Sequence, residues 1–465
     1  MREPFRGMAL AMMFPLGIWA ITTGQEPGPQ GEPKAEEKEK PGAVAERPVG
    51  WTTAVDPKPI SPSVKRGLDW LVEHQLKDGG WGQGDESKQM GGGAELRDKP
   101  NVADTSIAAL ALIRSGSTPS DGPYKDALAK AVRFVRSQVE SSDSESLDVS
   151  TVKGTRVQMK LGPNIDTFLA SLFLAEAKGR MAEPEENRSL DVALNKVIGK
   201  IKKHQKADGS WDNATGWAPI LAQSMAGKGI NRAAQNGVKV DGMLLARTEN
   251  FARIQFASPS SASAIFPAET PAVAAAPASS TRSFARGMAG GRVGGGAGSA
   301  GVELYDRASS LSVLSDSVNS NATKEAELKK KVETSRDEKE VAEAKDALKR
   351  FGEARNVRDQ AQKAVVERLE DRSFVSGFGS NGGEEFLSYM NIGESLVLKG
   401  GEEWKKWDRS MTENMNRIQN DDGSWSGHHC ITGRTFCTST ALLVLLSDRT
   451  PVPAQAKDKD KPAEK

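Results

Sequence analysis

The 465-residue sequence predicts an all-α protein built from repeated pairs of helices, and three observations support this. The spacing Q-x-x-D-G-[GS]-W occurs three times along the chain. An amphipathic pattern, with apolar residues three and four positions apart, precedes each copy. A more uniformly apolar segment follows each copy, which is typical of a buried helix. Each repeat is therefore expected to hold an outer helix, a Gly-Trp loop and an inner helix.

The repeated motif supplies nine positions that we interpret as structural repeat residues. Its Asp-Gly pair predicts a helix end, because glycine tolerates the left-handed conformation that closes a helix. A tryptophan in a Gly-rich loop can seal the seam between two helices. Stacking of these tryptophans on a substrate is the weaker alternative. The nine positions are Gln75, Asp78, Trp81, Gln205, Asp208, Trp211, Gln419, Asp422 and Trp425.

Further helices follow from the same apolar patterns and give four to five predicted helix pairs. The inner helices that follow the motif copies are expected over residues 104–113, 220–226 and 438–446. A degenerate pair without the motif is expected over residues 124–139 and 165–175. Near the C-terminus, residues 384–398 resemble an inner helix and residues 402–419 an outer one.

The N-terminal residues predict an exported protein. Arg2 and Arg6 precede an apolar segment from Met8 to Ile21, which is shorter than the roughly 20 residues that cross a bilayer. Small residues follow at 22–24, so residues 1–24 are interpreted as a cleavable signal peptide. An uncleaved anchor is the alternative. The mature protein is expected in the periplasm or outside the cell, with no transmembrane span, although association with a membrane stays open.

Composition divides the rest of the chain into helical and non-helical parts. The helical domain is predicted to occupy residues 61–250 and 380–448. Residues 25–60 and 449–465 are predicted to be a disordered linker and tail, and residues 251–322 a low-complexity loop. Residues 323–372 are dense in charge, with a thin apolar stripe, and predict a long solvated helix or helical hairpin. A self-pairing coiled coil is the alternative for that segment.

Charge excludes one class of partner. The net charge is +1 with both signs mixed along the chain, so the sequence gives no reason to expect nucleic-acid binding. The expected partners are an apolar or isoprenoid-like small molecule, or another envelope protein.

The three motif copies resemble the repeats of terpene cyclases and protein prenyltransferases, which include the squalene–hopene cyclases. The resemblance covers about residues 60–250 and 380–447. It implies an α/α toroid, in which inner helices surround a central cavity and the motif Gln and Trp tie neighbouring repeats together. With four to five predicted pairs, the ring is incomplete, completed by helices of the insert, or paired with another domain or chain.

The chemistry of this family is only partly matched. Hopene cyclases protonate an alkene with an Asp of a D-x-D-D-T segment, and the nearest match here is residues 101–105, where Ala103 stands at the donor position. Asp104 and Asp166 are therefore weak catalytic candidates, and a role at the start of a helix is favoured for both. Aromatic residues make up only 6% of the chain, although a cyclase cavity needs many of them to stabilise carbocations.

One short segment holds the densest set of metal-type ligands, namely His428, His429, Cys430 and Cys437. Prenyltransferases hold zinc with an Asp, a nearby Cys and a later His, an order that this segment does not reproduce. Because an exported protein meets an oxidising compartment, a disulfide between the two cysteines is favoured. A zinc site and two free thiols are the alternatives. No cofactor is expected, with zinc as the exception to test.

Two functions of different classes follow. The first, which we favour, is a binding or scaffold module for an apolar ligand or a partner protein. The second is a terpenoid cyclase or prenyltransferase-type enzyme that acts on an isoprenoid substrate through a diverged site. An aromatic-lined cavity with one buried carboxylate would favour the enzyme, and an interior filled by side chains would favour the binding module.

Overall fold

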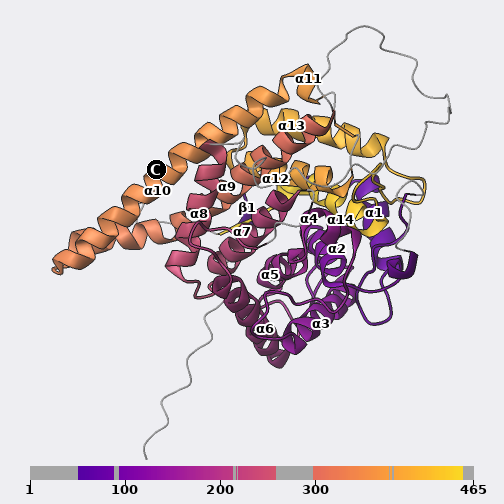
Figure 1. The fold of residues 1–465 in the computed structure, drawn as a ribbon, viewed down its shortest axis with the longest axis horizontal. Helices are drawn as coiled ribbons and strands as arrows, with labels where there is room; N and C mark the ends of the chain where they lie inside the picture. The colour runs from indigo at the N-terminus through magenta and orange to yellow at the C-terminus, as the bar shows by residue number, and fades with distance from the viewer. Residues whose placement is uncertain are drawn as a thin grey trace, which may run out of the picture. The chain divides into compact units, whose positions relative to one another are not determined.

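The computed structural model describes residues 51–87, 94–212, 216, 218–257, 297–375, 378–379 and 382–453, and its regular structure is almost entirely helical (Figure 1). This confirms the predicted all-α class. No described helix is both long enough and apolar enough to cross a membrane. In chain order the elements are β1 (Trp51–Thr53), α1 (Pro62–Glu73), η2 (Ala94–Leu96), α2 (Val102–Arg114), α3 (Lys125–Ser141), α4 (Arg156–Leu161), α5 (Ile165–Ala177), α6 (Pro184–Lys203), α7 (Pro219–Gln235), α8 (Gly242–Ala257), α9 (Ala297–Thr334), α10 (Glu338–Leu369), α11 (Arg372–Val375), α12 (Gly383–Lys399), α13 (Gly401–Arg417), α14 (Arg434–Leu445), η5 (Ser447–Arg449) and β2 (Pro451–Pro453).

Six helices form a closed series of contacts. They are α2, α5, α7, α9, α12 and α14; each contacts the next, and α14 contacts α2. We call them the inner helices. The outer helices α1, α3, α6, α8, α10 and α13 each pack against at least one of them. Every residue of α2 and α5 is buried, whereas the outer helix α1 buries only one face. This division matches the amphipathic and uniformly apolar patterns of the sequence.

Helix α9 corrects the prediction of a loop over residues 251–322. The part of that range from 297 onward is helical, and α8 extends to Ala257. The buried Leu304, Ala308, Leu311 and Leu314 are spaced as on one helical face, but the intervening serines gave the segment a low-complexity composition. Residues 258–296 lie outside the described part of the chain.

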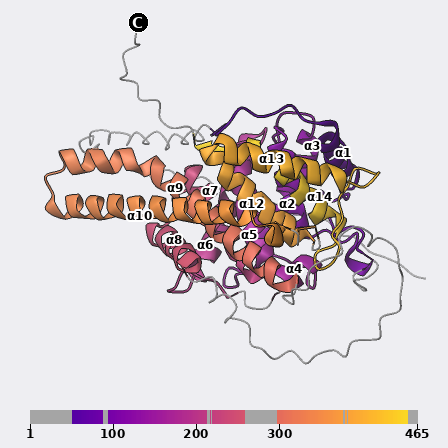
Figure 2. The same ribbon diagram turned by 90° about the horizontal axis from the view of Figure 1, so that it is seen from above.

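The charged segment 323–372 is part of a helical hairpin rather than a separate insert. Helix α10 runs alongside α9 (Figure 2). Helix α9 itself lies between α7 and α12 in the inner series. The interrupted stretch of the sequence therefore supplies an inner helix and the outer helix that packs against it.

A two-stranded ladder joins the two ends of the described chain. Strand β1 pairs antiparallel with β2, with Trp51 opposite Pro453 and Thr53 opposite Pro451. This corrects the prediction that all of residues 25–60 and 449–465 are disordered. Local composition could not reveal the pairing, because the two strands are far apart in sequence. The predicted signal peptide at 1–24 and the tail from 454 lie outside the described residues.

The repeat motif makes the same contacts at each of its three copies. Each Trp donates its indole N–H to a carbonyl ten residues earlier: Trp81 to Leu71 (2.7 Å), Trp211 to Ile201 (2.8 Å) and Trp425 to Met415 (2.9 Å). Each motif Asp accepts a backbone N–H two residues on: Asp78 from Gly80, Asp208 from Ser210 and Asp422 from Ser424. The intervening glycines, Gly79, Gly209 and Gly423, have φ of 90–92°, which other residues adopt only with strain.

The motif glutamines connect one outer helix to the next. Gln75 Nε2 donates to the Ala127 carbonyl of α3 at 2.9 Å, and Gln205 Nε2 donates to Thr248 Oγ1 of α8 at 3.0 Å. Gln419 Nε2 donates to the Ser63 carbonyl of α1 at 2.8 Å, across most of the chain. The last motif copy thus ties the end of α13 to the first turn of α1.

Replacing Gln419 with Ala should lower the free energy of unfolding by about 1–2 kcal/mol, because the Ser63 and Gly423 carbonyls lose their shared donor. Urea denaturation measures the change. Gln360, exposed on α10, is the matched control, and Gln360→Ala should stay within about 0.5 kcal/mol of wild type. Equal effects of the two changes would contradict a tie at Gln419.

Candidate functional site

Asp104 lies at the N-terminal end of the inner helices but does not cap its own helix. Asn101 is the N-cap of α2, and its Oδ1 accepts the Asp104 backbone N–H at 2.9 Å. The Asp104 carboxylate is fully buried; Oδ2 accepts from Asn101 Nδ2 at 2.7 Å. Its Oδ1 has no hydrogen-bond partner. The expected capping role of Asp104 is therefore filled by Asn101.

Asp166 caps the neighbouring helix. Its Oδ1 accepts the backbone N–H of Ala103, in the first turn of α2, at 3.1 Å, and its Oδ2 accepts from Gln158 Nε2 at 2.8 Å. Burial raises the pKa of Asp104 to about 7. The hydrogen bond from Asn101 acts in the opposite direction, whereas the negative charge of Asp166 adds to the rise. Burial also raises the pKa of Asp166. Two buried carboxyl groups therefore lie close together at the starts of α2 and α5.

A third buried carboxylate, Glu384, begins α12 and faces the His-Cys segment. Ligand atoms of Glu384, His429 and Cys430 all lie within 4.8 Å of one another, and they form a group that could hold a metal ion. His429 Nδ1 is 3.0 Å from Cys430 Sγ. Burial raises the pKa of Glu384 to about 7, although the backbone N–H groups of Glu384 and Ile431 oppose this shift.

The structure separates the four residues that the sequence grouped as metal candidates. His429 and Cys430 belong to the group with Glu384, whereas His428 is exposed. Cys437, inside α14, donates its thiol to the Ile431 carbonyl at 3.3 Å. Both cysteines are free, so the favoured disulfide prediction is wrong. The two residues lie on different elements, and Cys430 directs its sulfur to His429 instead. Glu384 was missed because nothing near it in sequence suggests a ligand.

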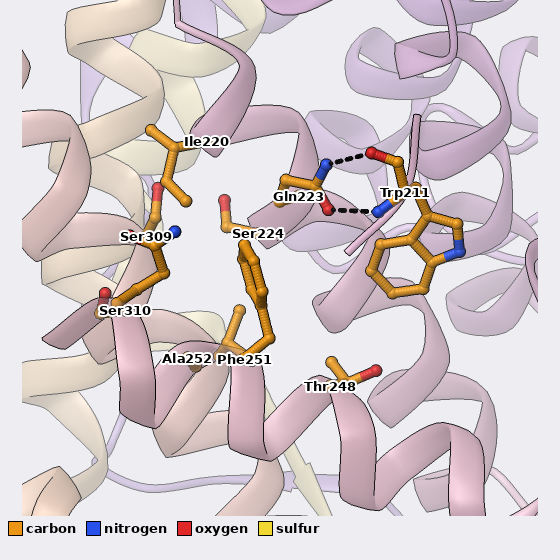
Figure 3. A pocket seen from close by; sticks show the side chains of 11 residues that line it. Trp211, Ile220, Gln223, Ser224, Thr248, Phe251, Ala252, Ser309 and Ser310 are labelled. Atoms are coloured by element: carbon orange, nitrogen blue, oxygen red, sulfur yellow. Dashed lines mark hydrogen bonds between the residues drawn. The ribbon is translucent and has the colours of Figure 1, made fainter. Parts of the chain in front are cut away.

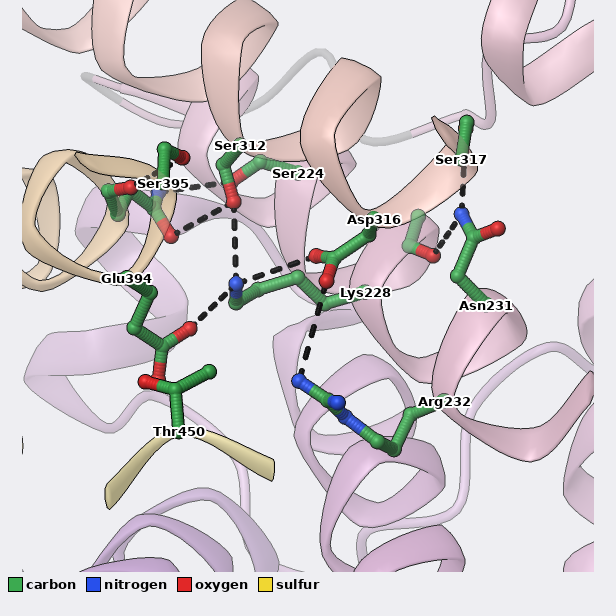
Figure 4. Close-up of polar contacts among 12 residues, drawn as sticks. Ser224, Lys228, Asn231, Arg232, Ser312, Asp316, Ser317, Glu394, Ser395 and Thr450 are labelled. Atoms are coloured by element: carbon green, nitrogen blue, oxygen red, sulfur yellow. Dashed lines mark hydrogen bonds and ion pairs between the residues drawn. The ribbon is translucent and has the colours of Figure 1, made fainter. Parts of the chain in front are cut away.

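Buried ionised groups occupy the C-terminal halves of the inner helices (Figure 4). Arg114 of α2 pairs with Glu176 of α5 at 2.6 Å and with Glu394 of α12 at 2.8 Å. Lys228 of α7 pairs with Glu394 at 2.5 Å and with Asp316 of α9 at 3.2 Å. With Arg232 of α7, which pairs with Glu176 and Asp316, the set holds three cations and three anions. We call these six residues the charged cluster.

Pairing within the charged cluster favours the ionised forms of Glu394 and Lys228. Burial would raise the pKa of Glu394, but Lys228 and Arg114 lower it to about 2. Burial would lower the pKa of Lys228, but Asp316 and Glu394 raise it. The Arg232 guanidinium lies 5.3 Å from the centre of the Trp51 ring and donates to the Pro451 carbonyl. The paired strands β1 and β2 therefore contact the cluster. In the sequence, the only indication of the charged cluster is that single charged residues occur inside otherwise apolar helices.

A small pocket lies between α7, α8 and α9 (Figure 3). Gln223 spans one side of it, accepting from the Trp211 backbone N–H at 3.2 Å and donating to the Trp211 carbonyl at 3.0 Å. Its free volume of about 10 Å³ has room for about one water molecule. Gln255 Oε1 and Ser309 Oγ are buried without partners, and a water molecule there would give both oxygens a hydrogen bond. The pocket therefore has the size of a hydration site.

A larger open groove lies between the outer helices α10 and α13, with α12 at its base. Its free volume is about 680 Å³. Seven apolar side chains line it: Val366, Leu369, Val375, Phe378, Leu396, Trp407 and Met411. Charged side chains also line it, among them Glu402, Glu403, Lys406 and Arg417. The groove thus combines apolar side chains with polar groups, as small-molecule sites do.

Comparisons with protein-family models, with curated proteins and with solved structures give no match to this chain.

Replacing Asp104 with Asn should stabilise the protein increasingly as pH rises from about 4 to about 7. The pKa of Asp104 is raised from 3.8 to about 7 in the folded state, so the folded chain holds a proton that the unfolded chain releases. Wild type therefore loses stability across this window, by at most about 4 kcal/mol, and the Asn variant does not. Urea denaturation at several pH values measures the difference. Asp126→Asn, at an exposed site on α3, is the control; a pH-independent difference for Asp104→Asn would contradict the prediction.

Replacing Lys228 with Met should lower the free energy of unfolding by about 3–5 kcal/mol, because Glu394 and Asp316 would each lose a buried cation. Thermal and urea denaturation both report the loss. Lys329→Met removes an exposed partner of Glu325 and should change stability by less than about 1 kcal/mol. A Lys228 variant as stable as the Lys329 variant would show that the charged cluster does not support the fold.

Proposed function

We propose that this chain is an α/α toroid of the terpene cyclase and prenyltransferase type that acts as a binding module for an apolar ligand. The closed series of contacts among the six inner helices supports the toroid, and so does the packing of the outer helices against them. The hydrogen bonds that the motif Trp and Gln side chains repeat at each copy support the resemblance to that family. Helices α9 and α10 then complete six helix pairs, with α9 inside and α10 outside.

The charged cluster disfavours cyclisation inside the ring. A cyclase cavity stabilises a carbocation with aromatic faces. Here the C-terminal halves of the inner helices place Arg114, Lys228 and Arg232 inside, all buried. These cations are paired with three buried carboxylates, so this end of the ring holds ion pairs rather than the aromatic faces that a carbocation needs.

The groove between α10 and α13 is the observation that carries the proposal. Its volume of about 680 Å³ falls within the range of about 300–1,000 Å³ that is common for small-molecule sites. Trp407, Met411 and Leu396 are buried among its lining residues. Val366, Leu369 and Phe378 of the lining are half-exposed, so an isoprenoid-like chain would cover these apolar groups, and its polar end would meet charged groups such as Lys406. Binding there needs no cofactor.

An enzyme acting on an isoprenoid is the second candidate, and one observation favours it. Burial raises the pKa of both Asp104 and Glu384 to about 7, so each could carry a proton near neutral pH. A buried carboxylic acid is the kind of group that a proton-transfer reaction requires. This candidate places the substrate at the N-terminal ends of the inner helices rather than in the groove.

The proposed location is outside the cytoplasm. The proposal rests on Arg2, Arg6 and the apolar segment from Met8 to Ile21, which lie outside the described residues. An envelope location would give the module access to apolar molecules at membrane surfaces, without requiring a membrane span of its own.

Replacing Val366 with Glu should weaken binding of radiolabelled farnesol at least tenfold, because a charge would face the apolar side chains of the groove. Equilibrium dialysis with the purified full chain measures the affinity. Val341, on the same helix and equally half-exposed, lies away from the groove, and Val341→Glu should bind as wild type does. Absence of binding, or binding that Val366→Glu leaves unchanged, would overturn the proposal. Conversion of squalene or farnesyl diphosphate to a product that Asp104→Asn abolishes would favour the enzyme.

A further inference from the structure

The loop before α14 is held tightly against the start of α12. The Gly383 backbone N–H donates to the Ile431 carbonyl at 2.8 Å, and the Ile431 N–H donates to Glu384 Oε2 at 3.2 Å. A Cβ atom at Gly382 or Gly427 would lie only 2.2–2.3 Å from the Ile431 carbonyl oxygen. These glycines allow two backbones to approach closely, and the approach brings Glu384 beside His429 and Cys430.

One carboxylate oxygen in this arrangement has no partner. Glu384 is fully buried; Oε2 accepts from the Ile431 backbone N–H, and Oε1 has no hydrogen bond of standard geometry, although the Cys430 thiol lies close enough to lower the carboxyl pKa. A buried polar atom without a partner destabilises the fold, and more so when it is charged. The unpartnered Glu384 oxygen therefore marks a place where a positively polarised group would be bound.

His429 and Cys430, which lie next to Glu384, supply two further side chains that commonly coordinate metal ions. The ligand atoms of Glu384, His429 and Cys430 lie within 4.8 Å of one another, with Nδ1 to Sγ at 3.0 Å. Ligand atoms around a tetrahedral zinc ion are about 3.3–3.8 Å apart, given bonds of about 2.0–2.3 Å. Small side-chain rotations would bring the three donors to that spacing.

The backbone at Cys430 is also unusual. Cys430 has φ of 67°, and it is the only non-glycine residue with positive φ in the part of the chain that the structure describes. Such a conformation is strained for a residue with a side chain and persists where the surroundings impose it. Here it accompanies a sulfur that faces His429.

We propose that Glu384, His429 and Cys430 bind one zinc ion through a carboxylate oxygen, an imidazole nitrogen and a thiolate sulfur, with a fourth position open. Oxygen, nitrogen and sulfur together suit zinc better than a hard cation such as Mg²⁺. Two anionic ligands would balance the charge of the ion, and binding would release to solvent the Cys430 thiol proton and, where Glu384 is protonated, its carboxyl proton. Lys160 is the cation that faces His429 and Cys430, and the titratable groups Glu385, Tyr305, His428 and Cys437 also face the three ligands.

The site differs from the four-residue set that the sequence indicated. Glu384 replaces His428 and Cys437, since His428 is exposed and the Cys437 thiol is engaged with Ile431. The chain thereby offers a matched control for two of the ligands. His428 is next to His429 in sequence, and Cys437 is the only other cysteine.

The test is a zinc titration of the metal-stripped full chain, with bound metal measured by mass spectrometry after gel filtration. We expect one zinc per chain in wild type, and at least a tenfold loss of affinity in Glu384→Gln, His429→Ala and Cys430→Ser. His428→Ala and Cys437→Ser should bind as wild type does. Circular dichroism of each variant establishes that the fold is kept, and Glu384→Gln is nearly isosteric.

Cobalt substitution provides a second measurement that identifies the sulfur ligand. Co²⁺ bound to wild type should give a thiolate charge-transfer band, which Cys430→Ser removes and Cys437→Ser retains. Failure of wild type to bind zinc would overturn the proposal, as would equal losses in the two cysteine variants or in the two histidine variants. The result does not depend on the groove, because none of these residues lines it.

Discussion

Closing the series of helices depends on contacts between the first and last repeats. Trp425 packs against α1 so closely that a Cβ atom at Gly67 would lie 2.7 Å from its ring, and Gln419 donates to the Ser63 carbonyl of the same helix. Each repeat buries its inner helix only against its two neighbours, so a gap in the series would expose two apolar faces. The glycine and the Gln-Trp motif together let the chain ends meet and cover those faces.

The closed series of inner helices also explains why the charged cluster can be buried at their C-terminal ends. A single cation inside a helical core would cost several kcal/mol. Here five inner helices converge, and each brings an opposite charge to its neighbour, as Arg114 does to Glu176 and Glu394. No single helix could satisfy its own charge. The charged cluster therefore favours one arrangement of the inner helices over alternatives with a shifted register, which would leave charges unpaired.

The sequence allowed the repeats, most helices and their inner or outer position to be predicted, because these depend on local period and on a motif with fixed spacing. It did not allow α9 to be predicted, since alternating serines obscured the stripe of Leu304, Leu311 and Leu314. It also gave no indication that Glu384 would face His429 and Cys430. Such a site depends on which helix start lies beside which loop. The expected disulfide failed for the same reason: a short sequence separation between Cys430 and Cys437 says little about where the two sulfurs point.

Two glutamates on α12 show how differently the two ends of the inner helices are built. Both are buried side chains on the same helix, yet the pKa of Glu394 falls to about 2 and that of Glu384 rises to about 7. Glu394 has Lys228 and Arg114 against it, whereas burial dominates at Glu384 and the nearby Glu385 adds to the shift. Paired charges at the C-terminal end need nothing further and serve the fold. Uncompensated carboxyl groups at the N-terminal end destabilise the fold unless something binds them, and such groups cluster at functional sites. The N-terminal end of α12, where Glu384 lies beside His429 and Cys430, is therefore the part of the inner helices where a bound group would stabilise the fold.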